Sequence, residues 1–156
     1  MPRNAREIDL DPRTYVGLSF PLRADTNNSF TMTKNSIQQS RHNLRNLLLT
    51  YPGERPHNLE FGCKLREVCF EQQDENLPEK IQTVIADAVT KFLPYINIVD
   101  ISTQSDTVQS EKIYVTIKFS TTLDPLVNQS LTLDATGATE VDSAGAGDSS
   151  RPSGGY

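Results

Sequence analysis

The sequence predicts an α+β fold in which an N-terminal arm and helices pack on a small antiparallel sheet. Between residues 33 and 94, apolar residues recur at the three- and four-residue spacing of amphipathic helices. After Pro94 the apolar period becomes two, which is typical of half-buried strands. Helices followed by a run of strands favour a sheet with helices on one face. The 22 residues from 135 to 156 hold five of the eight glycines and predict a flexible tail.

The totals fit one domain of ordinary size, which we place at residues 15–134 after an extended arm of residues 1–14. A net charge of -5 argues against a nucleic-acid partner, which would require clustered Lys and Arg. The chain has no run of 18 apolar residues and no N-terminal apolar segment, so we expect neither a membrane partner nor a secretion signal. Cys63 and Cys69 are expected to be free, buried thiols made in a reducing cytoplasm.

The elements follow in order from these patterns. Residues 15–22 read as a short strand. Residues 33–51 read as a helix that is capped by Thr33 and ended by Pro52 and Gly53. A short helix is expected within 62–70, and the clearest helix runs from a cap at Asn76 to a stop at Pro94.

Three strands complete the domain. Residues 95–102 form the first, with a bulge where Val99 breaks the alternation. A polar hairpin loop at 103–111 leads to a cleanly alternating strand at 112–120. The third strand lies within 124–135 and points Leu131 and Leu133 inward.

The stretch "TYPGERPHNLEFGCKL", residues 50–65, is dense in side chains that can do chemistry. Glu54, Glu60 and Glu71 are the candidates for a glycosidase carboxylate pair. With 20 acidic residues in the chain, solvated surface carboxylates are the favoured interpretation. His42 and His57 have no neighbours at metal-ligand spacing, and no nucleophile elbow or phosphate-binding glycine loop is present. We therefore predict no catalytic residue, cofactor or metal.

The same stretch reads better as a stiff loop between two helices. Phe61 is the large apolar side chain that can anchor the loop, and Gly62 allows a close backbone approach. Arg55 is predicted to act as a structural or interfacial fork for a carboxylate or for carbonyl groups.

The segment "NLRNLLLTYPGERPHNLEFGCKLREVCFE", followed by a helix, a proline and "IYVTIKFS", resembles the baseplate-wedge family of contractile phage tails. This family, also called the sheath-initiator family, includes the related wedge subunit of type VI secretion baseplates. The similarity covers residues 15–133, and its most specific parts are the helix end "LLTYPGER" and the segment Glu60–Glu71. The "DLDP" of residues 9–12 is also similar to that of tailed-phage members.

The resemblance implies a structural part of the virion tail baseplate that binds the helical core bundle of other wedge subunits. It also implies that the C-terminal strands template the first ring of the tail sheath, and it allows the tail tube or hub as a further partner. An open sheet edge recruits extended segments by strand addition, which agrees with this role. The candidate edge residues are Gln129, Ser130, Leu131, Thr132 and Leu133.

Family members often carry Glu-Pro-Arg after the long helix, at the grip on the core bundle. Here the matching residues are Leu93-Pro94-Tyr95, so only the proline is kept. Pro94 and Tyr95, with Arg55 and Glu60, are the candidate residues for contact with wedge partners. Some members have been described as lysozyme-like, so a peptidoglycan glycosidase that uses Glu60 and Glu71 is the alternative, and a free-standing adaptor is a third reading.

Overall fold

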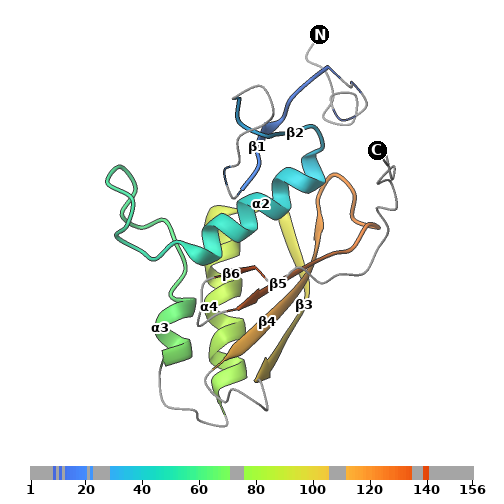
Figure 1. The fold of residues 1–156 in the computed structure, drawn as a ribbon. Helices are drawn as coiled ribbons and strands as arrows, with labels where there is room; N and C mark the ends of the chain where they lie inside the picture. The colour runs from blue at the N-terminus through green and yellow to red at the C-terminus, as the bar shows by residue number, and fades with distance from the viewer. Residues whose placement is uncertain are drawn as a thin grey trace, which may run out of the picture.

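The structure is a computed structural model and describes residues 9, 11, 13–20, 22, 29–70, 76–105, 112–134 and 139–140. The described helices are α2 (Ser36–Leu49), α3 (Leu65–Phe70) and α4 (Leu77–Phe92). Four antiparallel strands pair in chain order: β3 (Ile96–Ser105), β4 (Ile113–Thr121), β5 (Gln129–Asp134) and β6 (Thr139–Glu140). A separate two-stranded ribbon joins β1 (Gly17–Leu18) to β2 (Met32–Thr33). The predicted α+β fold is confirmed (Figure 1).

The core lies between the helices and one face of the sheet. Figure 1 shows α4 running alongside the sheet, α3 beside α4, and α2 crossing the upper end of α4. In β4, alternate residues from Ile113 to Phe119 are buried, while Tyr114, Thr116 and Lys118 lie on the outer face and are half-buried or exposed. The largest fully buried side chains are Phe119, Leu44, Leu47, Leu65, Ile81, Ile85, Ile117, Leu131, Leu133, Val89 and Val115.

The start of α2 differs from the prediction. The N-cap is Asn35, whose side chain accepts a hydrogen bond from the Ile37 backbone N–H, and Thr33 belongs to β2. A second acceptor comes from the arm: Asp9 Oδ1 lies 2.9 Å from Ser36 N and 2.7 Å from Ser36 Oγ. The cap was misplaced because Thr, Asn and Ser all favour this position, and the arm's contribution is not visible in a local pattern.

The other helix ends lie close to the predicted ones. The helix α2 ends at Leu49, with Thr50 as its C-cap, shortly before Pro52 and Gly53. The helix α4 has Asn76 at its N-cap position, although the Asn76 side chain makes no capping bond. A proline in the first turn fits this start, and the backbone N–H of Leu93 closes the last turn on Val89 O just before Pro94.

The ribbon was only half predicted. The strand expected at residues 15–22 is reduced to Gly17–Leu18, and its partner β2 lies where the sequence suggested only a helix cap. Ladder bonds extend the pairing on both sides, from Val16 N to Thr33 O and from Ser19 N to Thr31 O. The turn expected at residues 23–29 falls mostly outside the described residues.

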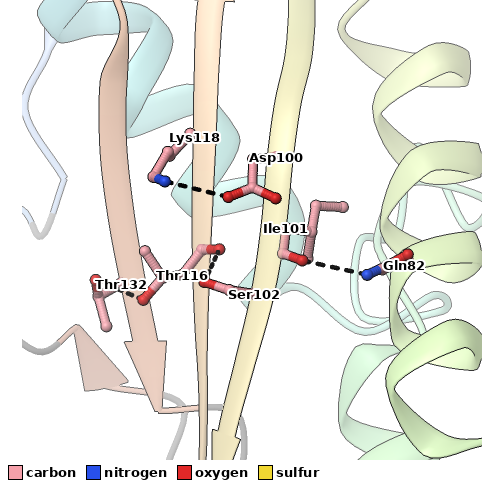
Figure 2. A network of polar contacts seen from close by, with 7 residues as sticks. All are labelled: Gln82, Asp100, Ile101, Ser102, Thr116, Lys118 and Thr132. Atoms are coloured by element: carbon pink, nitrogen blue, oxygen red, sulfur yellow. Dashed lines mark hydrogen bonds and ion pairs between the residues drawn. The ribbon is translucent and has the colours of Figure 1, made fainter.

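The first strand of the sheet carries the predicted bulge. The register of β3 against β4 shifts between Ile98 and Asp100, which leaves Val99 as the extra residue. The strand continues to Ser105, beyond the predicted end at residue 102. At the edge of β3 that faces away from β4, the Gln82 side chain of α4 donates a 3.2 Å hydrogen bond to the carbonyl oxygen of Ile101, as Figure 2 shows.

The solvent-facing side of the sheet is held by cross-strand polar pairs (Figure 2). Lys118 Nζ lies 3.2 Å from Asp100 Oδ2, and the hydroxyls of Thr116 and Thr132 lie 3.1 Å apart. Such pairs contribute a few tenths of a kcal/mol to about 1 kcal/mol each. This face is therefore a solvated surface whose side chains fix the register of three strands.

The last described strand lies within the segment expected to be a flexible tail. In β6, Glu140 is opposite Leu133 and Thr139 is opposite Asp134. The prediction missed this pairing because a two-residue strand in a sequence rich in Gly, Ser and Ala has no periodic signal. The remainder of the expected tail, residues 135–138 and 141–156, lies outside the described residues, as does most of the arm at residues 1–14.

Candidate partner-binding surfaces

The loop between α2 and α3 is fastened to the domain through Arg55 and Phe61. The guanidinium carbon of Arg55 lies 3.9 Å from the centroid of the Phe61 ring, and this ring packs at 5.2 Å against Phe92 of α4. The predicted anchor role of Phe61 is confirmed by this packing. The guanidinium group of Arg55 thus covers the Phe61 ring of its own chain.

Glu60 is also bound within the chain. Its Oε2 lies 2.8 Å from Lys91 Nζ on α4, and this hydrogen bond lowers the pKa of Glu60. Both side chains are largely exposed, so the pair contributes little to stability. The contact ties the loop to α4 and leaves the Glu60 carboxylate accessible from outside.

Gly62 makes the tightest backbone approach in the loop. Its φ is +138°, and a Cβ at this position would lie 2.5 Å from Thr50 O and 2.8 Å from Pro52 N. The backbone N–H of Cys63 then reaches Thr50 O at 2.9 Å, which closes the loop on the end of α2. The loop is therefore closed on α2 by a backbone approach that a side chain at position 62 would block.

Pro94 and Tyr95 occupy the turn between α4 and β3. The Tyr95 hydroxyl accepts a 2.9 Å hydrogen bond from Asn43 Nδ2, and the Tyr95 carbonyl oxygen accepts from both the N–H and the hydroxyl of Thr122 at 3.0 Å. Tyr95 thus joins α2 to the loop after β4 and is still partly exposed. It lines a pocket of about 400 Å³ together with Gln39 and Asn43.

A chain of side-chain hydrogen bonds runs along this pocket and was not found from the sequence. Thr33 Oγ1 bonds to Gly17 O and to the side chain of Gln39, and Gln39 Nε2 donates to Asn43 Oδ1 at 2.9 Å. Asn43 in turn donates to Tyr95. The signal that could have revealed it is the i, i+4 amide pair on one face of α2.

The candidate edge residues of β5 separate into two sets. Leu131 and Leu133 are fully buried and face the helices, so they belong to the core. Ser130 is exposed and Thr132 is half-buried. All five candidate residues, Gln129 to Leu133, pair with β4, from Gln129 opposite Phe119 to Leu133 opposite Val115.

The backbone direction of β5 follows from the Gln82 bond. Because the carbonyl of Ile101 points at Gln82, the Ile101–Ile117 pair exchanges no hydrogen bonds, and the backbone groups of Ile117 point toward Leu131. The backbone N–H and C=O of Ser130 and Thr132 therefore point away from β4. Since β6 pairs only with Leu133 and Asp134, these groups form an open edge within the described part of the sheet.

Among the residues of this region that the structure describes, the thiols and carboxylates do not form a reactive cluster. Burial raises the pKa of Cys63 and of Cys69 to about 11, so both are protonated and inert at neutral pH. Glu54 accepts from the Tyr51 backbone N–H, and Glu71 lies outside the described residues. Among the described residues, no group of three or more His, Cys, Asp or Glu is arranged to hold a metal ion.

None of the described helices has the length and apolar character needed to cross a membrane.

The sequence profile of the family described as baseplate wedge protein gp25 matches residues 34–126, which run from the start of α2 through β4. The chain belongs to this family. The match includes the stiff loop, both long helices and the Pro94–Tyr95 turn, and the similarity noted from the sequence is confirmed. Among curated proteins, none matches the chain.

Three solved structures share the fold of this chain. A chain of the anti-feeding prophage baseplate is 22% identical with a TM-score of 0.61, covering 67% of this chain and 83% of that one. A putative tail lysozyme from Geobacter sulfurreducens is 16% identical with a TM-score of 0.59, covering 65% and 91%. A chain of the type VI secretion baseplate complex is 18% identical with a TM-score of 0.50, covering 62% and 88%. Family membership supports a structural role in a baseplate, and likeness at these identities extends to the fold alone.

Proposed function

We propose that this protein is a structural wedge subunit of a contractile phage tail baseplate that starts sheath assembly by pairing strands with the first sheath ring. The proposed strand pairing with the sheath rests on the open edge of β5. There, the backbone groups of Ser130 and Thr132 point outward, beside the buried Leu131. An incoming extended segment gains main-chain hydrogen bonds there without disturbing the core.

The opposite edge of the sheet is less suited to strand addition. The β3 edge has a bulge at Val99, and its Ile101 carbonyl already accepts from Gln82. Bulges and occupied backbone groups are devices that protect sheet edges from pairing. The sheath contact is therefore proposed at β5.

The proposed wedge contact lies at the Pro94–Tyr95 turn and at the stiff loop. Tyr95 presents a partly exposed ring that is held in place by Asn43 and Thr122, which makes it a preorganised contact. Arg55 and Glu60 hold the loop from within while Glu60 stays accessible. The proposed partners are the helical core bundle of the wedge, the tail sheath and the tail tube or hub, all within the virion tail baseplate.

The glycosidase alternative gains no support from Glu60. An acid catalyst needs a carboxyl group whose pKa is raised in an apolar site. The bond to Lys91 lowers the pKa of Glu60, and the side chain is solvated. We propose a structural role without muralytic activity, so that the purified chain and its Glu60→Gln variant should be equally inactive on peptidoglycan. Clearing of cell-wall substrate by the wild-type chain alone would contradict this.

The strand-pairing role is tested by a proline at the open edge. Ser130→Pro removes an outward N–H and leaves the bonds between β4 and β5 in place, whereas Ser130→Ala keeps the N–H. Electron microscopy of tail particles should show baseplates without sheath for the proline variant and sheathed tails for the alanine variant. A circular dichroism melt confirms that both variants fold. Normal sheathed tails from a folded Ser130→Pro variant would refute the assignment of the edge.

A further inference from the structure

We infer that β6 is a placeholder strand, which this chain supplies to its own sheet edge and which must leave before an incoming sheath segment can pair along the whole of β5. The inference rests on the proposed function, because it concerns the regulation of the same edge. It adds an intramolecular competitor to the strand pairing with the sheath. The chain thereby keeps part of its binding edge closed until the sheath protein is present.

The placeholder strand β6 lies on the edge of β5 that is proposed for the sheath contact. The opposite edge of β5 is paired with β4 along its full length, Gln129–Asp134. On the free edge, β6 pairs with Leu133 and Asp134, and Figure 1 shows it beside β5. Two strands cannot bond to the same backbone groups, so β6 and an incoming segment compete for this end of the edge.

Three residues of β5 direct their backbone groups away from β4. Two of them are Ser130 and Thr132, and the alternation along the strand adds Asp134. Asp134 is opposite Thr139, so this pair exchanges both of its N–H···O=C bonds. An incoming segment that pairs with the whole of β5 needs the Asp134 groups as well, and it obtains them only when β6 is released.

The pairing of β6 is short enough to be displaced. The strand comprises only Thr139 and Glu140, and a hairpin of this length has little stability by itself. Glu is depleted in strands, and Glu140 stands opposite Leu133, which is fully buried. A longer incoming strand can therefore replace β6 with a net gain of main-chain hydrogen bonds.

The two edges of the sheet are covered in different ways. At β3 the cover is the Gln82 side chain, and it belongs to α4, which contributes Ile81 and Ile85 to the core. That cover cannot leave without unfolding the domain. Among the described strands, β6 pairs only with β5, so its release leaves the helices and the other three strands of the sheet in place. The cover at β5 is therefore the reversible one.

Self-pairing sets the sheath concentration at which strand addition begins. The hydrogen bonds of one antiparallel residue pair favour the paired state of β6 roughly fivefold. A partner that needs the released state binds with an affinity that is reduced by the same factor. Loss of the pairing should therefore strengthen sheath binding, whereas a stronger pairing should weaken it.

The test is a titration of baseplate particles with the purified tail sheath protein. Thr139→Pro removes the N–H that bonds to Asp134 and should release β6, whereas Thr139→Ala keeps this N–H. Glu140→Val places a β-branched apolar residue opposite Leu133 and should strengthen β6, whereas Glu140→Gln keeps a polar residue there. Electron microscopy measures the sheath concentration at which half of the particles are sheathed. This midpoint should be about fivefold lower for Thr139→Pro than for Thr139→Ala, and about twofold higher for Glu140→Val than for Glu140→Gln.

The outcomes separate this inference from the proposed function. A gain from Thr139→Pro cannot arise from misfolding, because a damaged subunit would start less sheath. Equal midpoints within either pair of variants, or a shift in the opposite direction, would overturn the placeholder role of β6. Particles with Ser130→Pro enter the same titration: if they become sheathed like the wild type, the edge assignment and this inference both fall. If they stay bare while Thr139→Pro gives no gain, only the inference about β6 falls.

Discussion

Asp9 and Ser36 are joined although they lie 27 positions apart: Asp9 Oδ1 accepts from both the backbone N–H and the hydroxyl of Ser36. This contact ties the arm to the first residue of α2. It also places a carboxylate at the positive end of the helix dipole, in addition to the Asn35 cap. The N-terminal arm is therefore docked on its own chain at this point.

Removal of the Asp9 carboxylate is expected to destabilise the domain. The Asp9→Ala variant should lose about 1 kcal/mol of unfolding free energy, because a capping acceptor and a favourable charge are both lost. Asp9→Asn keeps an acceptor without the charge and should lose less. Urea denaturation measures both values, and equal stability of the alanine variant and the wild type would show that the arm contact contributes nothing.

A methyl group at Gly62 is expected to be far more damaging than one at Gly53. Both glycines have a positive φ, so each alanine incurs backbone strain of about 1–2 kcal/mol. Only Gly62 also brings its Cβ against Thr50 O and Pro52 N, whereas Gly53 has open space around it. Gly62→Ala should therefore lose about 3 kcal/mol or more. Thermal melts of the two variants, compared side by side, test whether the close approach matters beyond φ.

The two thiols are expected to be silent toward thiol reagents in the folded protein. Their pKa values of about 11 leave almost no thiolate at pH 8, and the side chains are buried. Labelling with a chromogenic disulfide reagent should detect both thiols only after denaturant is added. Rapid labelling of Cys63 or Cys69 without denaturant would contradict their buried positions.

The same shifts predict how stability depends on alkaline pH. The folded-state pKa is raised above the ordinary value of 9.0, so the folded state keeps its thiol protons more tightly than the unfolded state does. The stabilisation is complete below about pH 9 and is lost as the pH rises toward about 11. A Cys63→Ala, Cys69→Ala double variant should lose less stability over this window, and an equal loss would assign the alkaline effect to other groups.

Two truncations should distinguish β6 from the remainder of the tail. Deletion of residues 141–156 should leave the melting temperature unchanged, as expected for a segment whose large apolar residues are limited to Val141 and Tyr156. Deletion of residues 135–156 also removes the partner of Leu133 and Asp134 and should cost about 1 kcal/mol. If both deletions gave the same melting temperature, the pairing of β6 with β5 would contribute nothing to stability.

The sequence was sufficient wherever a periodic pattern was long. The stripe of α4 and the alternation of β4 gave their elements to within one or two residues, because each repeats over several turns or pleats. It was insufficient for β2 and β6, whose two residues each are too short for any period, and it made the strand that contains β1 too long. The bulge at Val99 was recognised because it broke an otherwise regular alternation.

The candidate partner-binding surfaces were likewise predictable only in part from the sequence. The turn of the loop out of α2 was predictable, because proline fixes φ and glycine allows the positive φ that Gly53 and Gly62 adopt. The contacts of Arg55 and Glu60 were not predictable. Arg55 stacks on Phe61, although a carboxylate or carbonyl partner was expected, and Glu60 binds Lys91, which lies 31 positions away in the chain. The burial of Leu131 and Leu133 followed from alternation, whereas the direction of the open backbone groups needed the Gln82 bond.

The Gln82 bond to Ile101 has a consequence for how the sheet can grow. A sheet with two available edges can add copies on both sides and propagate without limit into a fibre. Here one side is occupied by a helix side chain and bent by Val99, while the other presents the outward groups of Ser130 and Thr132. Growth of the described sheet therefore has a single direction, which limits the pairing of copies of this chain into a fibre through the sheet.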